Sequence, residues 1–227
     1  MSKSSEAFIE SLAAEGRVLL LGGLAVIAHG LSRATKDVDV WLDPLSCPSE
    51  WTALLQRVLQ RHCGAAPYDL KNKRVVQAGA LEQVIDRDGV IRVVGLDRPV
   101  DIFRVPHNLQ AADFPDVWQH ARIQVGGARL PDEIDLLVTK EGTARPQDAA
   151  DIAFLEERVR MRLSEQLRTC TFAEAHAIFQ RYVDHETCRA ALENPEEQVR
   201  ELALSHLRRF AADGDPFARE LLEGHGA

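Results

Sequence analysis

The chain has 227 residues, 45% of them hydrophobic and 27% charged, which is ordinary for a globular protein with a substantial core. Its net charge of −8 argues against non-specific nucleic-acid binding over a broad basic surface, although a local basic patch is compatible with it. The four cysteines are far apart and form no C-x-x-C pair, so we expect free thiols in a reducing compartment rather than a zinc site or disulfide framework.

The start of the chain does not have the pattern of a targeting segment. MSKSSEAFIESLAAEG lacks a basic stretch followed by an apolar core, and Ser4 to Glu15 predicts a short amphipathic helix instead. The longest apolar run, residues 18–28, is too short to span a membrane and is interrupted by glycines. We therefore expect a cytoplasmic protein with no membrane partner.

Residues 19–43, LLLGGLAVIAHGLSRATKDVDVWLD, predict a strand, a glycine turn, a short helix, a polar loop and a second strand. Gly22 and Gly23 follow the first strand, where glycine permits a positive φ and a close backbone approach to a ligand. The short helix after them would present unpaired N–H groups, which favour anions such as phosphate.

Asp37 and Asp39 lie in the second strand, DVDVW, whose period of two places both carboxylates on one face. Adjacent like-charged carboxylates are unfavourable unless a cation neutralises them. Mg²⁺ is commonly held by one or two carboxylates together with substrate phosphates. The pattern therefore predicts a nucleoside triphosphate on the glycine turn, with Mg²⁺ (or Mn²⁺) held by the two aspartates.

A glycine pair, about a dozen residues and then D-hydrophobic-D-hydrophobic resembles the signature of the nucleotidyltransferase superfamily related to polymerase beta. The fuller sequence GGLAVIAHGLSRATKDVDVWL is most similar to the branch that contains AbiEii-type and MenT-type toxins. The resemblance covers roughly residues 17–155. One departure is Gly22-Gly23 where many members have Gly-Ser, so backbone N–H groups or another group would have to replace the serine hydroxyl as a phosphate ligand.

Arg33, Thr35 and Lys36 lie in the loop that precedes Asp37. We expect Arg33 to contact phosphate and Thr35 to help shape the metal-binding loop, with an ordinary solvated loop as the alternative. For Lys36 the solvated loop is the preferred interpretation. His29 is interpreted as a packing histidine rather than a catalytic one.

The middle of the chain predicts a helix that begins near Pro48, followed by a return to strands. Short strands are expected at Val75–Val76, Gln83–Ile85 and Ile91–Val94, with a turn at residues 86–89. The most basic part of the chain lies in this region, and we interpret it as a solvated face, with contact to RNA or another anionic substrate as the alternative. Its residues are Arg57, Arg61, Lys71, Lys73 and Arg74.

Asp101 lies in the sequence PVDIF, between Val100 and Ile102. Since successive side chains of a strand alternate between faces, Asp101 is expected to point away from the apolar face on which its two neighbours lie. Polymerase-beta-like enzymes use a third carboxylate in such a setting on a neighbouring strand. The resemblance thus makes Asp101 the candidate general base or third metal ligand. Asp97 is the competitor, but its surroundings have the composition of a turn.

The segment PDEIDLLVTKEGTARPQDAADIAFL extends the resemblance, since related enzymes have a lysine, then an arginine and Asp-x-x-Asp after the sheet. By that similarity Lys140 would reach the triphosphate, Asp148 would lie at the rim of the active site, and Arg145 and Asp151 would support it. Before this segment, residues 122–130 predict a hairpin around Gly126-Gly127, and Gly142 is expected to end the helix that carries Lys140.

Residues 160–227 have the pattern of a helical region with breaks near Pro195 and Gly214. Arg200 and His206 have the R-x5-H spacing of HEPN ribonucleases, but the motif is weak on one helix and a ribonuclease is not favoured. We expect two domains, a nucleotidyltransferase core over residues 1–160 and a C-terminal helical region over 161–227.

The expected fold is of the α/β (α+β) class, with a small mixed β-sheet flanked by helices. The expected activity is an Mg²⁺-dependent transfer of a nucleotidyl group from an NTP to an acceptor hydroxyl. The resemblance leaves open a tRNA or other RNA end, a protein side chain or a small molecule as acceptor. It also implies a candidate role in a toxin–antitoxin or phage-defence system with an antitoxin-like partner. The alternative is a non-catalytic module of the same fold that binds nucleotide or a partner protein.

Overall fold

The computed structural model describes residues 4–45, 47–124, 126–141 and 145–225. The chain divides into two compact units, Met1–Ala153 and Phe154–Ala227, and the division falls within one long helix. The boundary expected from the sequence, between residues 160 and 161, lies in the same helix. None of the helices in the described part of the chain has the length and hydropathy needed to cross a membrane.

The first unit is a mixed α/β fold, as the sequence predicts. Its described strands form one eight-stranded sheet in the order β4-β3-β5-β6-β2-β1-β8-β7. The β2–β6 and β1–β8 pairs are parallel, whereas the other neighbours are antiparallel. The strands are β1 Val18–Leu21, β2 Val38–Leu42, β3 Ala66–Asp69, β4 Arg74–Val75, β5 Val90–Val94, β6 Val100–Phe103, β7 Arg122–Ile123 and β8 Arg129–Leu130.

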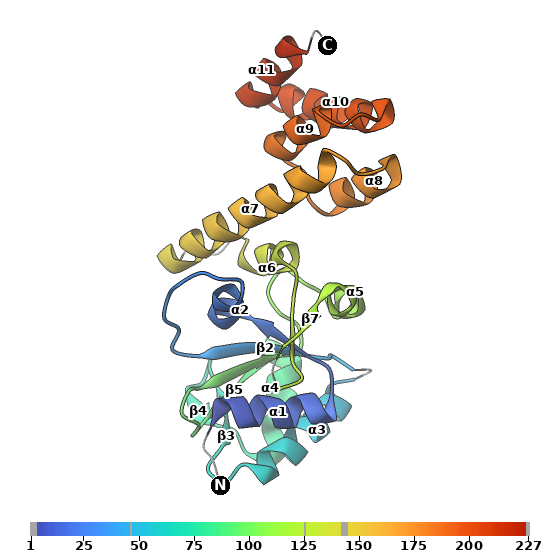
Figure 1. The fold of residues 1–227 in the computed structure, drawn as a ribbon. Helices are drawn as coiled ribbons and strands as arrows, with labels where there is room; N and C mark the ends of the chain where they lie inside the picture. Colours follow the sequence, from blue (N-terminus) through green and yellow to red (C-terminus); the bar gives the residue numbers. More distant parts are fainter. Residues whose placement is uncertain (1–3, 46, 125, 142–144, 226–227) are drawn as a thin grey trace. The chain divides into compact units, whose positions relative to one another are not determined.

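Helices cover both faces of the sheet (Figure 1). One face is covered by α1, α3 and α4, and the other by α2, α5 and α6. The bounds are α1 Ser5–Glu15, α2 Gly22–Ala28, α3 Pro48–Arg61, α4 Leu81–Asp88, α5 Phe114–His120 and α6 Glu133–Lys140, with 3-10 turns η1 Ala78–Ala80 and η2 Ala111–Asp113. The largest fully buried side chains include Trp41, Trp51, Phe8 and Phe114, which lie between the sheet and these helices.

Most of the helices expected from the sequence are present, and local signals explain their ends. Helix α3 begins with Pro48, whose fixed φ suits the first turn of a helix. The side chain of Asp132 caps α6 by accepting a hydrogen bond from the backbone N–H of Ile134 at 3.0 Å. The expected hairpin near residue 126 is present as β7 and β8, while Val125 and Gly142 lie outside the described residues.

The strand expected at Gln83–Ile85 and the turn at 86–89 are wrong, because this segment forms helix α4. Leu81, Val84 and Ile85 are buried at helical rather than alternating spacing, so burial on one helical face overrides the β-propensity of valine and isoleucine. Gly89 ends the helix with a φ of +67°, the left-handed conformation typical of a helix C-terminus. Strand β3 and helix α5 were not expected.

The second unit is helical, in agreement with the sequence. It contains the remainder of α7 Pro146–Leu167, followed by α8 Phe172–Arg181, α9 His185–Leu192, α10 Glu197–Ala212 and α11 Pro216–Gly224. Arg200 donates hydrogen bonds to the carbonyl oxygens of Asn194 and Pro195, and the His206 ring packs against Phe179. Both residues of the R-x5-H spacing therefore make structural contacts.

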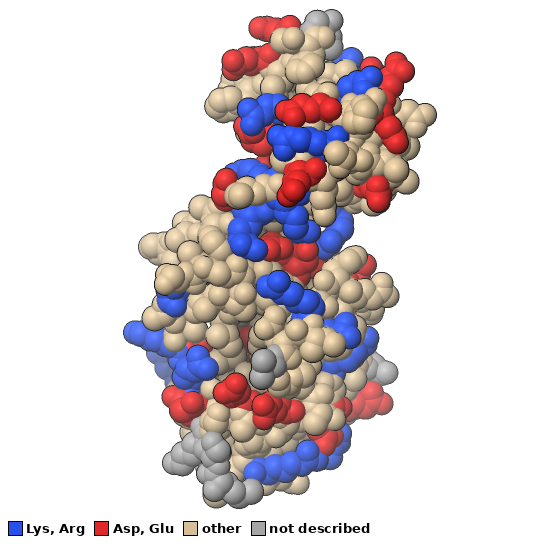
Figure 2. Space-filling view, in the orientation of Figure 1, with Lys and Arg blue, Asp and Glu red and all other residues tan. Residues whose placement is uncertain are grey.

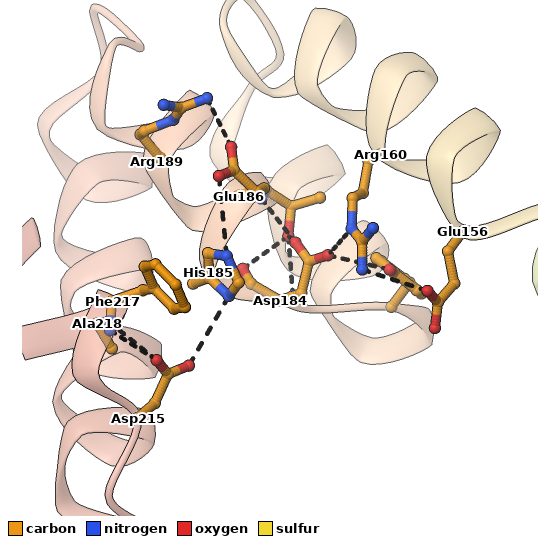
Figure 3. A network of polar contacts seen from close by, with 11 residues as sticks. Glu156, Arg160, Asp184, His185, Glu186, Arg189, Asp215, Phe217 and Ala218 are labelled. Carbon is orange, nitrogen blue, oxygen red and sulfur yellow. Dashed lines mark hydrogen bonds and ion pairs between the residues drawn. The ribbon is translucent and has the colours of Figure 1, made fainter. Parts of the chain in front are cut away.

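Asp184 is the centre of a polar network that joins α7 to α9 (Figure 3). Its carboxylate accepts hydrogen bonds from the Thr187 backbone N–H at 2.8 Å, from Arg160 at 2.7 Å and from the Tyr182 hydroxyl at 3.0 Å. Burial acts to raise the pKa of Asp184, but these hydrogen bonds outweigh it and hold the pKa below its ordinary value of 3.8. The ionised carboxylate thus stabilises the folded unit.

We predict that Asp184→Ala lowers the free energy of unfolding by about 2–4 kcal/mol at pH 7, because it removes a helix cap and leaves Arg160 and Tyr182 without their acceptor. The pKa of Asp184 is lower in the folded than in the unfolded chain. The stability difference between wild type and Asp184→Ala is therefore at its largest above the unfolded pKa near 3.8, and it shrinks as the pH falls through the folded pKa. Urea titrations at several pH values measure this. Asp184→Asn, which keeps a capping oxygen, should lose less, and a difference that does not change with pH would contradict the account.

Candidate functional site

A cleft of about 700 Å³ opens in the first unit, within the size range of small-molecule sites. Ten residues that the sequence analysis assigned to catalysis, metal or nucleotide binding all line it, although they come from the glycine turn, β2, β6, α6, α7 and two loops. These residues are Gly22, Gly23, Arg33, Thr35, Asp37, Asp39, Asp101, Lys140, Arg145 and Asp148.

The glycine turn fits against the acidic strand without room for side chains. Gly22 has a φ of +56°, and a Cβ atom added there would collide with the Asp39 carboxylate. A Cβ atom at Gly23 would lie 2.5 Å from Nη2 of Arg33 and 2.9 Å from Oγ1 of Thr35. The glycine pair therefore lets the backbone at the start of α2 lie against the Asp39 carboxylate, whereas the sequence analysis expected it to allow a close approach to a ligand.

Asp37, Asp39 and Asp101 are brought together by strand register. Asp39 in β2 pairs directly with Asp101 in β6, and such cross-strand partners project to the same face of a sheet. Asp37 precedes β2, and its Oδ1 lies 3.3 Å from Oγ1 of Thr35, in agreement with a role for Thr35 in shaping this loop. Burial, reinforced by the nearby charges of Asp101 and Asp37, raises the pKa of Asp39 to about 7.

Arg92 in β5 is the charged residue of this cluster that sequence reasoning missed. Its guanidinium donates to both oxygens of Asp101 at 2.7 Å, and it lies 3.5 Å from Oδ2 of Asp37. Arg92 is the register partner of Asp101 and therefore shares its face. A lone arginine in the apolar strand VIRVV was the available signal, but its partner could be identified only from the strand order.

The carboxylates of Asp37, Asp39 and Asp101 are oxygen ligands of the kind that Mg²⁺ prefers, although two of them, Asp37 and Asp101, pair with Arg92 in this structure. Among the described residues, no group of three or more His, Cys, Asp or Glu side chains is positioned to hold a metal ion. Asp37 and Asp39 nevertheless provide the one or two carboxylates that Mg²⁺ uses when phosphates complete its shell. The raised pKa of Asp39 marks a position where the negative charge is under-compensated and a divalent cation would be favourable.

Lys140 is the centre of a buried ion network at the other wall of the cleft. Its Nζ donates to Asp148 at 3.1 Å and to Asp151 at 2.7 Å, and all three residues are almost fully buried. Arg33 donates to Asp151 at 2.8 Å, and Arg145 donates to Asp148 at 2.6 Å. The network joins the loop before β2 to α6 and α7, so Lys140 holds the wall of the cleft as well as lining it.

Residues that the sequence analysis set aside lie in structural positions. Asp97 accepts hydrogen bonds from the backbone N–H groups of Ser5 and Arg98, and thus fixes the start of α1. His29 lies buried against Glu133 and the carbonyl oxygen of Pro131. Phe103, Pro106 and His107 also line the cleft and were not expected there, because the loop after β6 gives no sequence motif.

Neither protein-family models nor curated proteins give a match to this chain. The functional argument therefore rests on the geometry of the cleft and on the chemistry of its residues.

We predict that Lys140→Met destabilises the protein by about 3–5 kcal/mol, because it leaves two buried carboxylates without their central cation. Lys36→Met is the matched control, since Lys36 lines the same cleft but is exposed, and its effect should be within about 0.5 kcal/mol. Chemical denaturation of the full chain measures both. A similarly small effect of the two substitutions would show that the buried network contributes little to stability.

Proposed function

We propose that the protein transfers a nucleotidyl group from a nucleoside triphosphate to an acceptor hydroxyl with the help of Mg²⁺. The observation that carries the proposal is the contact of the glycine turn with the acidic strand, where Gly22 lies directly against the Asp39 carboxylate. A phosphate chain on this turn would lie beside the carboxylates that bind its cation, which is the arrangement that phosphoryl-transfer chemistry needs.

The triphosphate would be held by the backbone around Gly22 and Gly23 and by basic side chains of the cleft. Helix α2 has only seven residues, so we give more weight to the cations than to its dipole. Arg145 has 68% of its side chain exposed although it donates to Asp148, and Lys36 is exposed as well, so we assign both to contact with phosphate oxygens. We assign Lys140 to holding the wall of the cleft rather than to direct contact with the triphosphate.

Asp37 and Asp39 would hold the metal ion, with Asp101 beside them as the proton acceptor. When bound, Mg²⁺ supplies charge stabilisation for the phosphates and for the leaving group. The acceptor oxygen forms a bond to the α-phosphorus, the bond from the α-phosphorus to its bridging oxygen breaks, and pyrophosphate leaves. The acceptor proton passes to Asp101, which must first release one of the two oxygens that Arg92 occupies.

A second candidate function is a nucleotide-binding module without catalysis. The position of Arg92 favours it, since this guanidinium already neutralises Asp101 and lies close to Asp37. In that case Arg92 would remain in place when nucleotide binds, and the cleft would hold the triphosphate without activating an acceptor.

We predict that the pure protein, incubated with each α-³²P-labelled NTP, Mg²⁺ and a mixture of total RNA and cell lysate, transfers label to one acceptor class. Asp39→Asn should reduce transfer at least about 100-fold, because it removes a metal-binding carboxylate. Asp116→Asn is the matched control, since the Asp116 side chain is 72% exposed and does not line the cleft, and it should be fully active.

Nucleotide binding is measured separately with a fluorescent NTP analogue, with and without Mg²⁺. Binding by wild type without transfer to any pool would favour the binding module. Neither binding nor transfer, in a protein shown to be folded, would contradict both candidates.

A further inference from the structure

A continuous row of side chains runs across the sheet from the carboxylates to its edge. Asp39 pairs with Asp101, Asp101 with Arg92, Arg92 with Tyr68 and Tyr68 with Val75. Since direct cross-strand partners share a face, the row continues the floor of the cleft onto β3 and β4. With strands about 4.8 Å apart, Tyr68 lies roughly 10 Å from Asp101.

The outer half of this row is open. Val75 is 51% exposed and Tyr68 is half-buried, and neither lines the cleft itself. Among the described residues, none forms a hydrogen bond with the Tyr68 hydroxyl. A half-buried tyrosine ring beside an arginine, on an open part of a sheet face, is suited to stacking with a planar group.

The turn between β3 and β4 adds positive charge beside this surface. Lys71 and Lys73 are exposed there and form no ion pair with a described residue, although Lys71 contributes to lowering the pKa of Asp88. Asp69 fixes the turn by accepting hydrogen bonds from the backbone and side chain of Asn72 and from Arg87. Lys71 and Lys73 therefore belong to a turn whose conformation is fixed by hydrogen bonds.

We propose that this open surface, formed by Arg92, Tyr68 and Val75 with Lys71 and Lys73 beside it, binds the acceptor, and that the acceptor is the unpaired end of an RNA strand. The inference rests on the proposed function. The terminal base stacks on Tyr68, the two lysines contact backbone phosphates, and the strand's last hydroxyl reaches Asp101. Asp101 and Tyr68 are roughly 10 Å apart, two strand spacings along the same row.

The charge pattern restricts the RNA contact to a short segment. On the face drawn in Figure 2, basic and acidic side chains are interspersed and do not form one continuous basic field. Together with the net charge of −8, this disfavours a long duplex held through many phosphates. A stacked base with a few phosphate contacts requires much less positive charge.

The test is the affinity of the full chain for a short fluorescein-labelled single-stranded RNA, followed by fluorescence anisotropy without NTP. Tyr68→Ser should weaken binding at least about fivefold, and Tyr68→Phe should bind within about twofold of wild type, because stacking needs the ring and not the hydroxyl. Val75→Glu, on an exposed edge strand, is a second variant that should weaken binding by repelling phosphate. Replacing Lys71 and Lys73 by Gln should reduce the slope of log affinity against log salt by about 1.4.

Phe217→Ser and Arg208→Gln are the matched controls, because they remove an exposed aromatic ring and an exposed cation from the second unit, and neither should change binding. Equal RNA affinity of wild type, Tyr68→Ser and Val75→Glu, or no binding by wild type, overturns the inference. Transfer of label to a protein or small molecule that proceeds equally in Tyr68→Ser also overturns it, while the proposed function stands. Tyr68-dependent RNA binding without any nucleotidyl transfer supports the surface and contradicts the proposed function.

Discussion

Repulsion among three aspartates on neighbouring segments is the constraint on which the rest of the site depends. Asp39 lies half-buried beside Asp101 and Asp37, and its pKa of about 7 reflects first the loss of solvation and then the nearby charges of these two aspartates. The fold keeps these charges together by placing Arg92 on Asp101 and near Asp37. An arrangement that is electrostatically unfavourable in this way is typical of a site that binds a cation or performs chemistry.

The buried network of Lys140, Asp148 and Asp151 has a structural role, because it holds together the loop and helices that form the opposite wall of the cleft. Arg33 belongs to this network through Asp151, so the loop between α2 and β2 is held near its middle by Arg33 and at its end by the strand that contains Asp39. Glycine at positions 22 and 23 then allows the wall and the acidic strand to approach each other. The cleft lies between the Lys140 network, whose charges are paired, and the aspartate cluster, in which the charge of Asp39 is not fully compensated.

The sequence predicted the parts of this site that depend on local pattern. The Asp37/Asp39 pair and the glycine turn follow from alternation and turn composition, whereas the resemblance implied Asp101 and the turn-like surroundings of Asp97 argued against Asp97. These residues, Asp97 excepted, line one cleft. The role of Arg92 and the buried contacts of Lys140 depend on strand order and on packing of distant segments, which no local pattern encodes. The wrong strand at Gln83–Ile85 has the same origin, since burial on one helical face overrode the β-propensity of its residues.

The central claim is that the aspartates bind a divalent cation together with a triphosphate, and its most direct test is a crystal structure with Mn²⁺ and a non-hydrolysable NTP analogue. The account predicts an anomalous density peak between Asp37 and Asp39, phosphates against the Gly22 turn, and the Arg92 guanidinium moved away from Asp37. A structure in which Arg92 keeps both of its carboxylate contacts, with no Mn²⁺ at the aspartates while the nucleotide is bound, would contradict it.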